Sequence, residues 1–579
     1  MGINDTGTWQ RPRDVQDEDS EQCMANIEAE SWKSWPNEAG FVGLDEHRGP
    51  VDLVVTGHIP SWAAGTLFRT GPGEGRLEMS EGKTHNVSHW FDGFGHTHRF
   101  DIIPSPGSDS GGDGSVSSAS VRYSSRRNSQ ALIDDVKRRG WRAGVTFAQR
   151  ADPCMGIFSK MMTLFRTPPP NNNVVVERNV PGPLSVADGS STAGYRTGTR
   201  NLFVLTDSAH VQEIDADTME HLHDDSTPTK LHPDLAGPLS CAHPQRDPVN
   251  GDLYNYNLSL GRRPTYRIFR TSVSTGRTDI LATVTPPLLP IAYIHSLFLT
   301  PSYVVLCAPS SHLALYGIKI LIKRNVAEAL EPFDTSKLMK WVVIDRKGGK
   351  GVVASFTTPA GFFFHTINSF EEHGGEGRTS LVFDLAGYDD LSLIHGTYLD
   401  VLLDREDAAR KFWIDRDGRH KCHLSIRRYH FTVPSSPDTA ATGTADLVFS
   451  IPAPHCGELP TINPARATLR YRYVYSAGTR GLSTMMDSLV KTDLETHGAL
   501  LWNPPRGHTP GEPIFVARPV EAGGTGEEDD GVLLCVVLDG TAERSYLLVL
   551  DARSMEEIGR ADATFAIALG THGVYAKEI

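Results

Sequence analysis

The stretch CAHPQRDPVNGDLYNYNLSL (residues 241–260) joins a histidine, an Asn-Gly turn and a run of strand-forming residues. The same order of features returns in AYIHSLFLTPSYVVLCAP (292–309) and in GFFFHTINSFEEHGGEGRTSLVFDLAG (361–387). The three histidines, His243, His295 and His365, are 52 and 70 residues apart. Repetition of a histidine-turn-strand unit at such spacing predicts successive blades of a β-propeller with elaborated loops.

The rest of the chain fits the same architecture. Short runs rich in Val, Ile, Leu, Phe and Tyr recur between Gly, Pro, Asn and Asp, and helical periodicity is scarce. This pattern predicts an all-β protein. A length of 579 residues is too great for a single β-sandwich of about 100 residues.

A propeller arranges its blades radially, so the innermost strands line a central channel. The terminal stretch GTHGVYAKEI (570–579) follows a strand-like run and places His572 on the strand that closes the ring. We therefore expect His243, His295, His365 and His572 to converge on the axis. Each of them, taken singly, also fits an ordinary structural histidine.

A second group of histidines competes as a metal site. THNVSHWFDGFGHTHRF (84–100) holds His85, His89, His96 and His98 with spacings that suit zinc. Gly93 and Gly95 break the segment, and it has no helix to present the first pair on one face. We interpret it as a hairpin with core anchors at Trp90 and Phe91.

Composition limits the class of function. A net charge of −14 argues against a nucleic-acid partner. The seven cysteines occur singly, without a CxxC pair, which favours a reducing, cytoplasmic setting. No apolar run reaches the roughly 18 residues that a membrane span needs. Gly2 and Thr6 match the N-myristoylation pattern, which arises easily by chance.

The expected domain organisation is simple. Residues 1–45 are predicted to be a polar N-terminal extension, and residues 46–579 a single propeller domain. Two inserted segments, at about 104–120 and 434–446, lack core-forming residues and are predicted to be disordered surface loops.

Nine short motifs occur in order and together resemble the carotenoid cleavage oxygenase family, which includes the retinal-pigment-epithelium isomerohydrolase. The resemblance covers the chain from about residue 50 to its end. The motifs are GTLFRTGPG (65–73), HWFDGFGHTHRF (89–100), CAHPQRDP (241–248), AYIHSLFLTP (292–301), FFFHTINSFEE (362–372), GELPTINP (457–464), GEPIFVARP (511–519), EEDDGVLLCVVLD (527–539) and THGVYA (571–576).

The resemblance implies a seven-bladed β-propeller with a cap of helices and loops over an axial site, which holds one Fe(2+) per chain through His243, His295, His365 and His572. It also implies carboxylates behind three of these ligands: Glu458 behind His365, Glu512 behind His572 and Asp207 behind His295. Many members carry Glu at the last position, and the missing methylene of Asp207 leaves two ways to complete the contact with His295: a bridging water or a shift of the backbone. Imidazole ligands alone also suit zinc or copper, and the choice of iron rests on the resemblance.

Two apolar segments edged with basic residues bear on substrate delivery. They are GIFSKMMTLFR (156–166) and LALYGIKILIKR (313–324), and an ordinary core helix is the alternative reading of the first. The resemblance puts both at the entrance of a substrate tunnel, where they dock on a membrane surface or lipid body. The residues expected there are Ile157, Phe158, Met161, Met162, Phe165, Leu321 and Ile322.

The resemblance implies a peripheral-membrane dioxygenase that uses Fe(II) and O2 to cleave a carbon–carbon double bond of a carotenoid, giving apocarotenal products. The run from Val121 to Met162 is most similar to the fungal branch that cleaves torulene and β-carotene. Arg127 and Leu132 stand where the stilbene-cleaving branch has a tyrosine and a phenol-binding lysine. Stilbene cleavage, retinoid isomerohydrolysis without O2 and a non-enzymatic propeller scaffold remain as alternatives.

Overall fold

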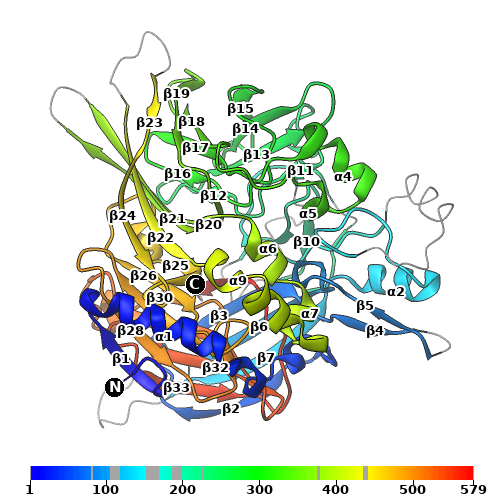
Figure 1. The fold of residues 1–579 in the computed structure, drawn as a ribbon, viewed down its shortest axis with the longest axis vertical. Helices are drawn as coiled ribbons and strands as arrows, with labels where there is room; N and C mark the ends of the chain where they lie inside the picture. The colour runs from blue at the N-terminus through cyan, green and yellow to red at the C-terminus, as the bar shows by residue number, and fades with distance from the viewer. Residues whose placement is uncertain are drawn as a thin grey trace.

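The computed structural model describes residues 2–79, 82–104, 118–150, 168–184, 199–223, 226–374, 378–433 and 441–577. The predicted inserted loop at 104–120 lies mostly outside these residues, although Ala119 at its end is buried and Ser120 begins a strand. Short apolar runs form strands, as the sequence predicts, and helices are few and brief (Figure 1).

Four sheets of four or five strands are built mainly from neighbouring segments of the chain, although β23 and β1 join their sheets from distant positions. The first contains β11 (Leu239–Ser240), β12 (Gln245–Arg246), β13 (Leu253–Ser259), β14 (Thr265–Thr271) and β15 (Thr278–Val284). The second contains β16 (Phe298–Leu299), β17 (Tyr303–Ala308), β18 (Met339–Asp345), β19 (Val352–Thr358) and β23 (Ala441–Thr444). The third contains β20 (Phe362–His373), β21 (Thr379–Tyr388), β22 (Ser425–Val433) and β24 (Asp446–Pro452). The fourth contains β25 (Gly457–Thr461), β26 (Tyr473–Gly478), β27 (Ser488–Asp493), β28 (Ala499–Asn503) and β1 (Gly7–Arg11).

Strands from the two ends of the chain close the arrangement. A three-stranded sheet contains β8 (Val175–Arg178), β9 (Leu202–Leu205) and β10 (Gln212–Ile214). A ten-stranded sheet contains β2 (Val51–Gly57), β3 (Gly65–Pro72), β6 (Gly95–Ile103), β7 (Ser120–Arg127), β29 (His508–Pro510), β30 (Ile514–Ala517), β31 (Gly531–Asp539), β32 (Arg544–Asp551), β33 (Glu557–Asp562) and β34 (His572–Lys577). The strands β4 (Arg76–Glu78) and β5 (Thr84–Asn86) form a separate hairpin.

The chain closes on itself at two places in the ten-stranded sheet. The final strand β34 pairs antiparallel with β3, with His572 opposite Thr70, and β2 pairs with β33. The mostly-β class is confirmed. A count of seven blades stays a prediction, because hydrogen bonds between β2 and β33 merge two expected units into one sheet.

Helices cluster in the connections on one side of the sheets. They are α1 (Gln16–Glu28), α2 (Gln130–Arg139), α4 (Ile318–Lys323), α5 (Val326–Ala329), α6 (Ser392–Gly396), α7 (Leu399–Leu402), α8 (Ala408–Arg410), the π-helix η12 (Lys411–Asp415) and α9 (Gly418–Lys421). The connection between β17 and β18 carries α4 and α5, and the connection between β21 and β22 carries α6 to α9 (Figure 1).

The N-terminal segment differs from the prediction of a polar extension. Strand β1 pairs along its full length with β28 and extends that sheet. Helix α1 is anchored where buried Asp19 contacts Nε of Arg11 at 2.8 Å and Nε2 of His455 at 2.8 Å. Residues 7–28 are therefore an integral part of the fold.

Part of the second predicted loop is also ordered. Residues 441–444 form β23, which pairs in parallel with β19, and Asp446 begins β24. Strands β1 and β23 are both polar, and each is ordered by backbone hydrogen bonds to a neighbouring strand. The pattern of side chains in the sequence does not reveal such bonds.

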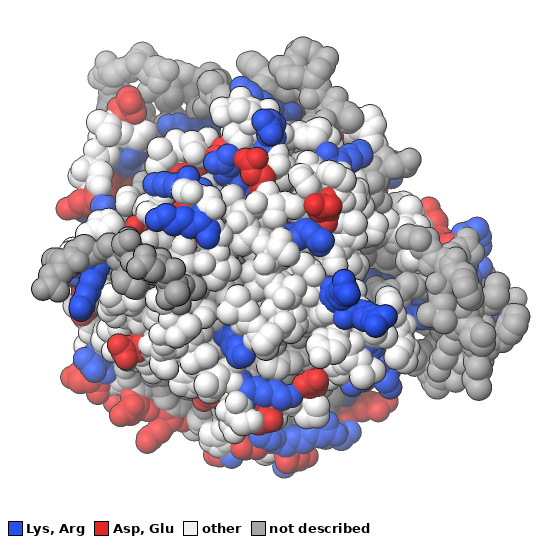
Figure 2. Space-filling view, turned by 90° about the horizontal axis from the view of Figure 1, so that it is seen from above, with Lys and Arg blue, Asp and Glu red and all other residues white. Residues whose placement is uncertain are grey.

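Charge is unevenly distributed over the surface. Figure 2 views the molecule from the top of Figure 1 and shows Lys and Arg side chains separated by broad uncharged areas. Asp and Glu are more frequent toward the lower edge of that view.

Candidate metal centre

Four different sheets deliver the four predicted histidines. His243 lies between β11 and β12 and forms an isolated bridge with Ser296. His295 comes just before β16, and His365 lies within β20 at a register shift between Phe363 and Thr366. His572 is the first residue of β34.

These histidines converge on one point. One ring nitrogen from each lies within 4.8 Å of the others. Nε2 of His243 is 3.1 Å from Nε2 of His295, and Nε2 of His365 is 3.2 Å from Nε2 of His572. The structure thus brings together the three histidines of the repeated sequence pattern and His572 of the terminal strand.

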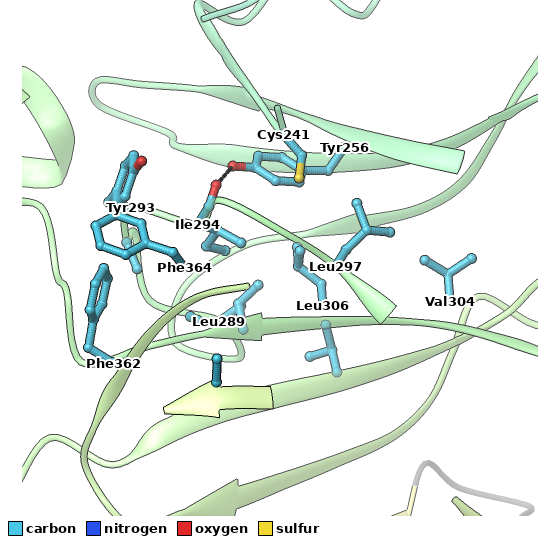
Figure 3. Close-up of a cluster of buried hydrophobic side chains, with 14 of the residues drawn as sticks. Cys241, Tyr256, Leu289, Tyr293, Ile294, Leu297, Val304, Leu306, Phe362 and Phe364 are labelled. Atoms are coloured by element: carbon cyan, nitrogen blue, oxygen red, sulfur yellow. Dashed lines mark hydrogen bonds between the residues drawn. The ribbon is translucent and has the colours of Figure 1, made fainter. Parts of the chain in front are cut away.

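A packed core fixes the backbone around His295. Ile294 directly precedes His295 in the sequence. The hydroxyl of Tyr256 donates a hydrogen bond of 2.8 Å to the carbonyl oxygen of Ile294 (Figure 3). The hydroxyl of Ser296, directly after His295, donates to the carbonyl of Phe364 at 2.7 Å and so ties this loop to the His365 strand. Close packing therefore holds two of the four rings relative to one another.

Carboxylates lie behind three of the rings. Nδ1 of His365 is 2.6 Å from Oε2 of Glu458, and Nδ1 of His572 is 2.9 Å from Oε1 of Glu512. Nδ1 of His295 is 2.9 Å from Oδ2 of Asp207. Asp207 therefore contacts His295 directly, which agrees with the expected backbone shift and not with a bridging water.

The missing methylene of Asp207 is compensated by its backbone position. The Asp207 carbonyl accepts a hydrogen bond from the Ser240 N–H at 3.0 Å, and the Ala242 N–H donates to Oδ1 at 3.3 Å. These bonds hold the Asp207 loop against the segment that leads to His243.

Two tyrosines that sequence reasoning missed support the carboxylates. The hydroxyl of Tyr293 donates to Asp207 at 2.6 Å, and that of Tyr388 donates to Glu458 at 2.8 Å. Burial, followed by the neighbouring carboxylate, holds the pKa of each tyrosine well above its ordinary value, so both hydroxyls stay protonated. The position of Tyr293 two residues before His295 is the only signal in the sequence.

The hydrogen-bonding pattern fits a cation between the rings. An ionised carboxylate only accepts hydrogen bonds, so Nδ1 of His365 and of His572 each carry a proton. Neutral rings of this tautomer present bare Nε2 lone pairs, and these face one another at 3.2 Å. A bound metal ion would relieve that repulsion, and the carboxylate-histidine pairs are those that orient metal ligands.

Burial favours the neutral, ligating form of His243 and His572. It lowers the pKa of His572 to about 4, although Glu512 opposes the shift. Burial and the other three histidines hold the pKa of His243 well below its ordinary value. Burial alone would raise the pKa of Glu458, but His365 and the other donors outweigh it and lower that pKa.

Three of the four histidines face a mainly apolar cavity of about 520 Å³. His295, His365 and His572 line it together with the aromatic rings of Phe91, Phe147, Tyr293 and Phe364. Phe91 contacts Phe147 and Phe364 at centroid distances of 5.0 and 5.4 Å. Both carboxylate oxygens of Asp92 are hydrogen-bonded: Oδ1 accepts from the Phe147 N–H and Oδ2 from the Ala148 N–H.

The entrance residues are described only in part. Leu321 and Ile322 lie on α4 with exposed fractions of 54% and 65%, and Leu321 also lines the cavity. Ile157, Phe158, Met161, Met162 and Phe165 lie outside the described residues.

The competing histidines serve the fold. The ring of His89 is buried and bonds the carbonyl of Ile394 at 3.0 Å and the N–H of Phe91 at 3.2 Å. Among the described residues, His85, His89, His96 and His98 do not gather as a set of metal ligands.

Comparison with known proteins decides the family. The family described as retinal pigment epithelial membrane protein matches residues 41–577. The chain belongs to this family. It is 50% identical to a torulene dioxygenase of Gibberella fujikuroi, with 99% of each chain covered. It is 46% identical to a carotenoid dioxygenase of Neurospora crassa, with 97% of this chain and 94% of the relative covered.

A solved member shares the fold. The cobalt-substituted apocarotenoid oxygenase of Synechocystis superposes with a TM-score of 0.69 at 22% identity. The superposition covers 94% of this chain and 98% of the other. The family model and the full-length relatives confirm the resemblance expected from nine short motifs over nearly the whole chain.

Proposed function

We propose that this protein is an iron-dependent dioxygenase that cleaves a carbon–carbon double bond of a carotenoid to give apocarotenal products. One observation carries the proposal: four imidazoles converge on one point, and the three that are backed by carboxylates line an apolar cavity. The full-length relatives named as torulene and carotenoid dioxygenases support the reaction class.

His243, His295, His365 and His572 would hold one ferrous ion per chain. Such an ion supplies the redox chemistry that lets dioxygen react with a carbon–carbon double bond. Asp207, Glu458 and Glu512 keep a proton on Nδ1 of their histidines, which leaves each Nε2 free to ligate. They also offset the positive charge of the ion inside a buried site.

The cavity would bind and orient the polyene. Its aromatic walls offer apolar contact and exclude water, and the carboxylates that line it, Asp92, Asp207 and Glu458, all accept hydrogen bonds from the protein. A polyene has no polar group along its length, so its register depends on the shape and end of the cavity.

The substrate would be torulene ahead of β-carotene. The carotenoid-cleaving relatives support this choice, and so does Leu132, which is 2% exposed and lines the cavity. An apolar leucine there offers no cation to a phenol, which counts against a stilbene substrate.

Peripheral attachment to a membrane or lipid body would deliver such a lipophilic substrate. Leu315, Tyr316, Leu321 and Ile322 are all more than half exposed on the turn and helix around α4. Lys319, Lys323 and Arg324 edge this apolar surface, as in helices that lie at the membrane interface. Among the described helices, none is long and apolar enough to cross a membrane.

Product mass analysis tests the proposal directly. The purified protein is incubated in detergent with torulene, β-carotene, resveratrol and a retinyl ester, in air and without oxygen. We expect apocarotenals from torulene first, only in air, and with label from isotopic dioxygen in both carbonyls. Cleavage of resveratrol alone would refute the substrate, and anaerobic turnover of the ester would refute the reaction class.

A further inference from the structure

A second cavity, of about 680 Å³, lies beside the helices of the β21–β22 connection. Arg150 borders it, together with residues of α6, α7, η12 and α9, and it shares no lining residue with the cavity at the histidines. We name it the basic cavity.

Its charge is opposite to that of the chain. Five cationic side chains and two carboxylates line the basic cavity, whereas the whole protein carries −14. The cations are Arg150, Arg405, Lys411, Arg416 and Lys421, and the carboxylates are Asp400 and Glu406. The excess of positive charge calls for an anionic ligand.

Three of these cations keep their charge available. Nζ of Lys411 donates to the backbone carbonyl of Glu406, and Nζ of Lys421 to that of Arg416. Within the described ranges, no carboxylate forms an ion pair with Lys411, Arg416 or Lys421. Arg150 is different, since it pairs with Asp400 at 2.5 Å and lies 4.4 Å from the Tyr398 ring centroid.

The basic cavity lies next to the apolar residues that pack against α5, the helix that follows α4. Tyr398, Val401 and Phe412 line it, and they form a buried cluster against which Ala327 of α5 packs. Backbone bonds join the same regions: Thr146 N–H donates to the Arg324 carbonyl at 3.0 Å, at the end of α4. Arg150 follows Thr146 by four residues, so at most about 14 Å of chain separates the cavity from α4.

We propose that the basic cavity binds the phosphate headgroup of an anionic membrane lipid while α4 inserts among the acyl chains. Lys and Arg suit phosphate oxygens through charge-assisted hydrogen bonds. A phosphate between Lys411, Arg416 and Lys421 would sit beside, and not within, the apolar surface. The proposal rests on the membrane attachment proposed above and adds the lipid class that it prefers.

Vesicle binding of the full-length protein tests this inference. The variant K411A/R416A/K421A removes the three available charges, all on exposed side chains. The control variant R277A/K347A/K350A removes three exposed charges from the β14–β15 and β18–β19 turns. Those turns lie at the strand ends opposite the connection that carries α4, and both variants have the same net charge.

We expect wild type and control to sediment alike with vesicles of equal parts phosphatidylcholine and phosphatidic acid. The cavity variant should bind them about 10- to 100-fold more weakly, since each basic residue adds to anionic-lipid affinity. Its binding to pure phosphatidylcholine should be unchanged. An equal loss in both variants, or no loss in either, would overturn the proposal.

A water-soluble short-chain phosphatidic acid separates the two proposals. Titration calorimetry should give one site in the wild type and none in the cavity variant. If it does so while no vesicle binds, membrane attachment fails and the headgroup site stands. If vesicles bind but the short-chain lipid does not, the headgroup site fails alone. Equally tight binding of inorganic phosphate would also overturn it, because the ligand would then be a free anion.

Discussion

Nδ1 of His295 lies 2.9 Å from Oδ2 of Asp207, the same separation as that between Nδ1 of His572 and Oε1 of Glu512. The shorter aspartate thus reaches its histidine directly. Oδ2 also accepts from Tyr293, so the carboxylate is oriented from both sides.

The first prediction follows from that contact. Asp207→Asn should lower iron retention and activity about 10- to 100-fold, as much as Glu512→Gln, because both replace a carboxylate with a neutral and weaker amide acceptor behind a proposed iron ligand. Iron content and turnover are measured on the purified variants. Asp234→Asn, at an exposed carboxylate, serves as the control. A much milder effect at Asp207 than at Glu512 would mean that its contact is dispensable.

The second prediction concerns the four ligands. His243→Ala, His295→Ala, His365→Ala or His572→Ala should each abolish activity and reduce bound iron well below one per chain. Three imidazoles cannot hold the ion as tightly as four. His373→Ala is the matched control, because His373 lies exposed at the end of the His365 strand. Full iron content in the His572 variant would refute the four-histidine assignment.

Three of the four histidines could be predicted because they share one local sequence context, and His572 because it lies on the strand that closes the ring. Its outer partners depend on tertiary packing: Tyr388 is 70 residues from Glu458 in sequence, and nothing local to either residue marks the contact. The reach of Asp207 depends on backbone bonds to residues 240–242, which composition does not encode.

The N-terminal segment shows another limit of pattern reading. Strand β1 joins β28 through backbone hydrogen bonds at a sheet edge, which polar side chains permit. The polar sequence of residues 7–11 therefore gave no indication that they form a strand. Residues 441–444 were missed as a strand for the same reason.

The third prediction concerns membrane attachment. Leu315→Ser with Ile322→Ser should move the protein from the membrane pellet to the supernatant, because both side chains are exposed and neither lines the cavity at the histidines. Turnover of a detergent-dispersed short apocarotenoid should persist. Val249→Ser with Val520→Ser, at exposed fractions of 92% and 75%, controls for general loss of surface apolarity. Equal release by both pairs would contradict a specific role for α4.

The fourth prediction uses the pH dependence of the N-terminal anchor. Burial opposes ionisation of Asp19, but hydrogen bonds from His455 and Arg11 outweigh it and lower its pKa. A lowered pKa stabilises the fold above the ordinary aspartate value of about 3.9, and the gain is lost as pH falls through the lowered pKa. Asp19→Asn should therefore loosen residues 7–28 at neutral pH.

Breaking a buried ion network costs about 3 kcal/mol, which is roughly a 100-fold rise in local opening. Hydrogen exchange of the α1 amides at pH 7 measures it, and the difference from wild type should vanish in acid below the lowered pKa. Asp17→Asn, at an exposed residue of the same helix, should change nothing. If the difference in hydrogen exchange between Asp19→Asn and wild type were the same at every pH, the shape of the Asp19 side chain, and not its charge, would hold α1 in place.

The last prediction assigns helix α1 a part in substrate selection. Cys23, Met24 and Ile27 line the cavity that contains the histidines. The helix is held close to the neighbouring loop, because Gly481 has a φ of +76° and a Cβ there would lie 2.4 Å from the Cys23 carbonyl oxygen. Its position is therefore fixed, and its side chains form a firm wall.

Met24→Trp should fill space at this wall and reduce the length of cavity that is available to a long polyene. We expect kcat/KM for torulene to fall about tenfold more than for a short apocarotenal, since a pocket discriminates by the volume it admits. Met24→Leu keeps the volume and should behave as wild type. An equal loss on both substrates would show that the wall at α1 supports the fold without setting substrate length.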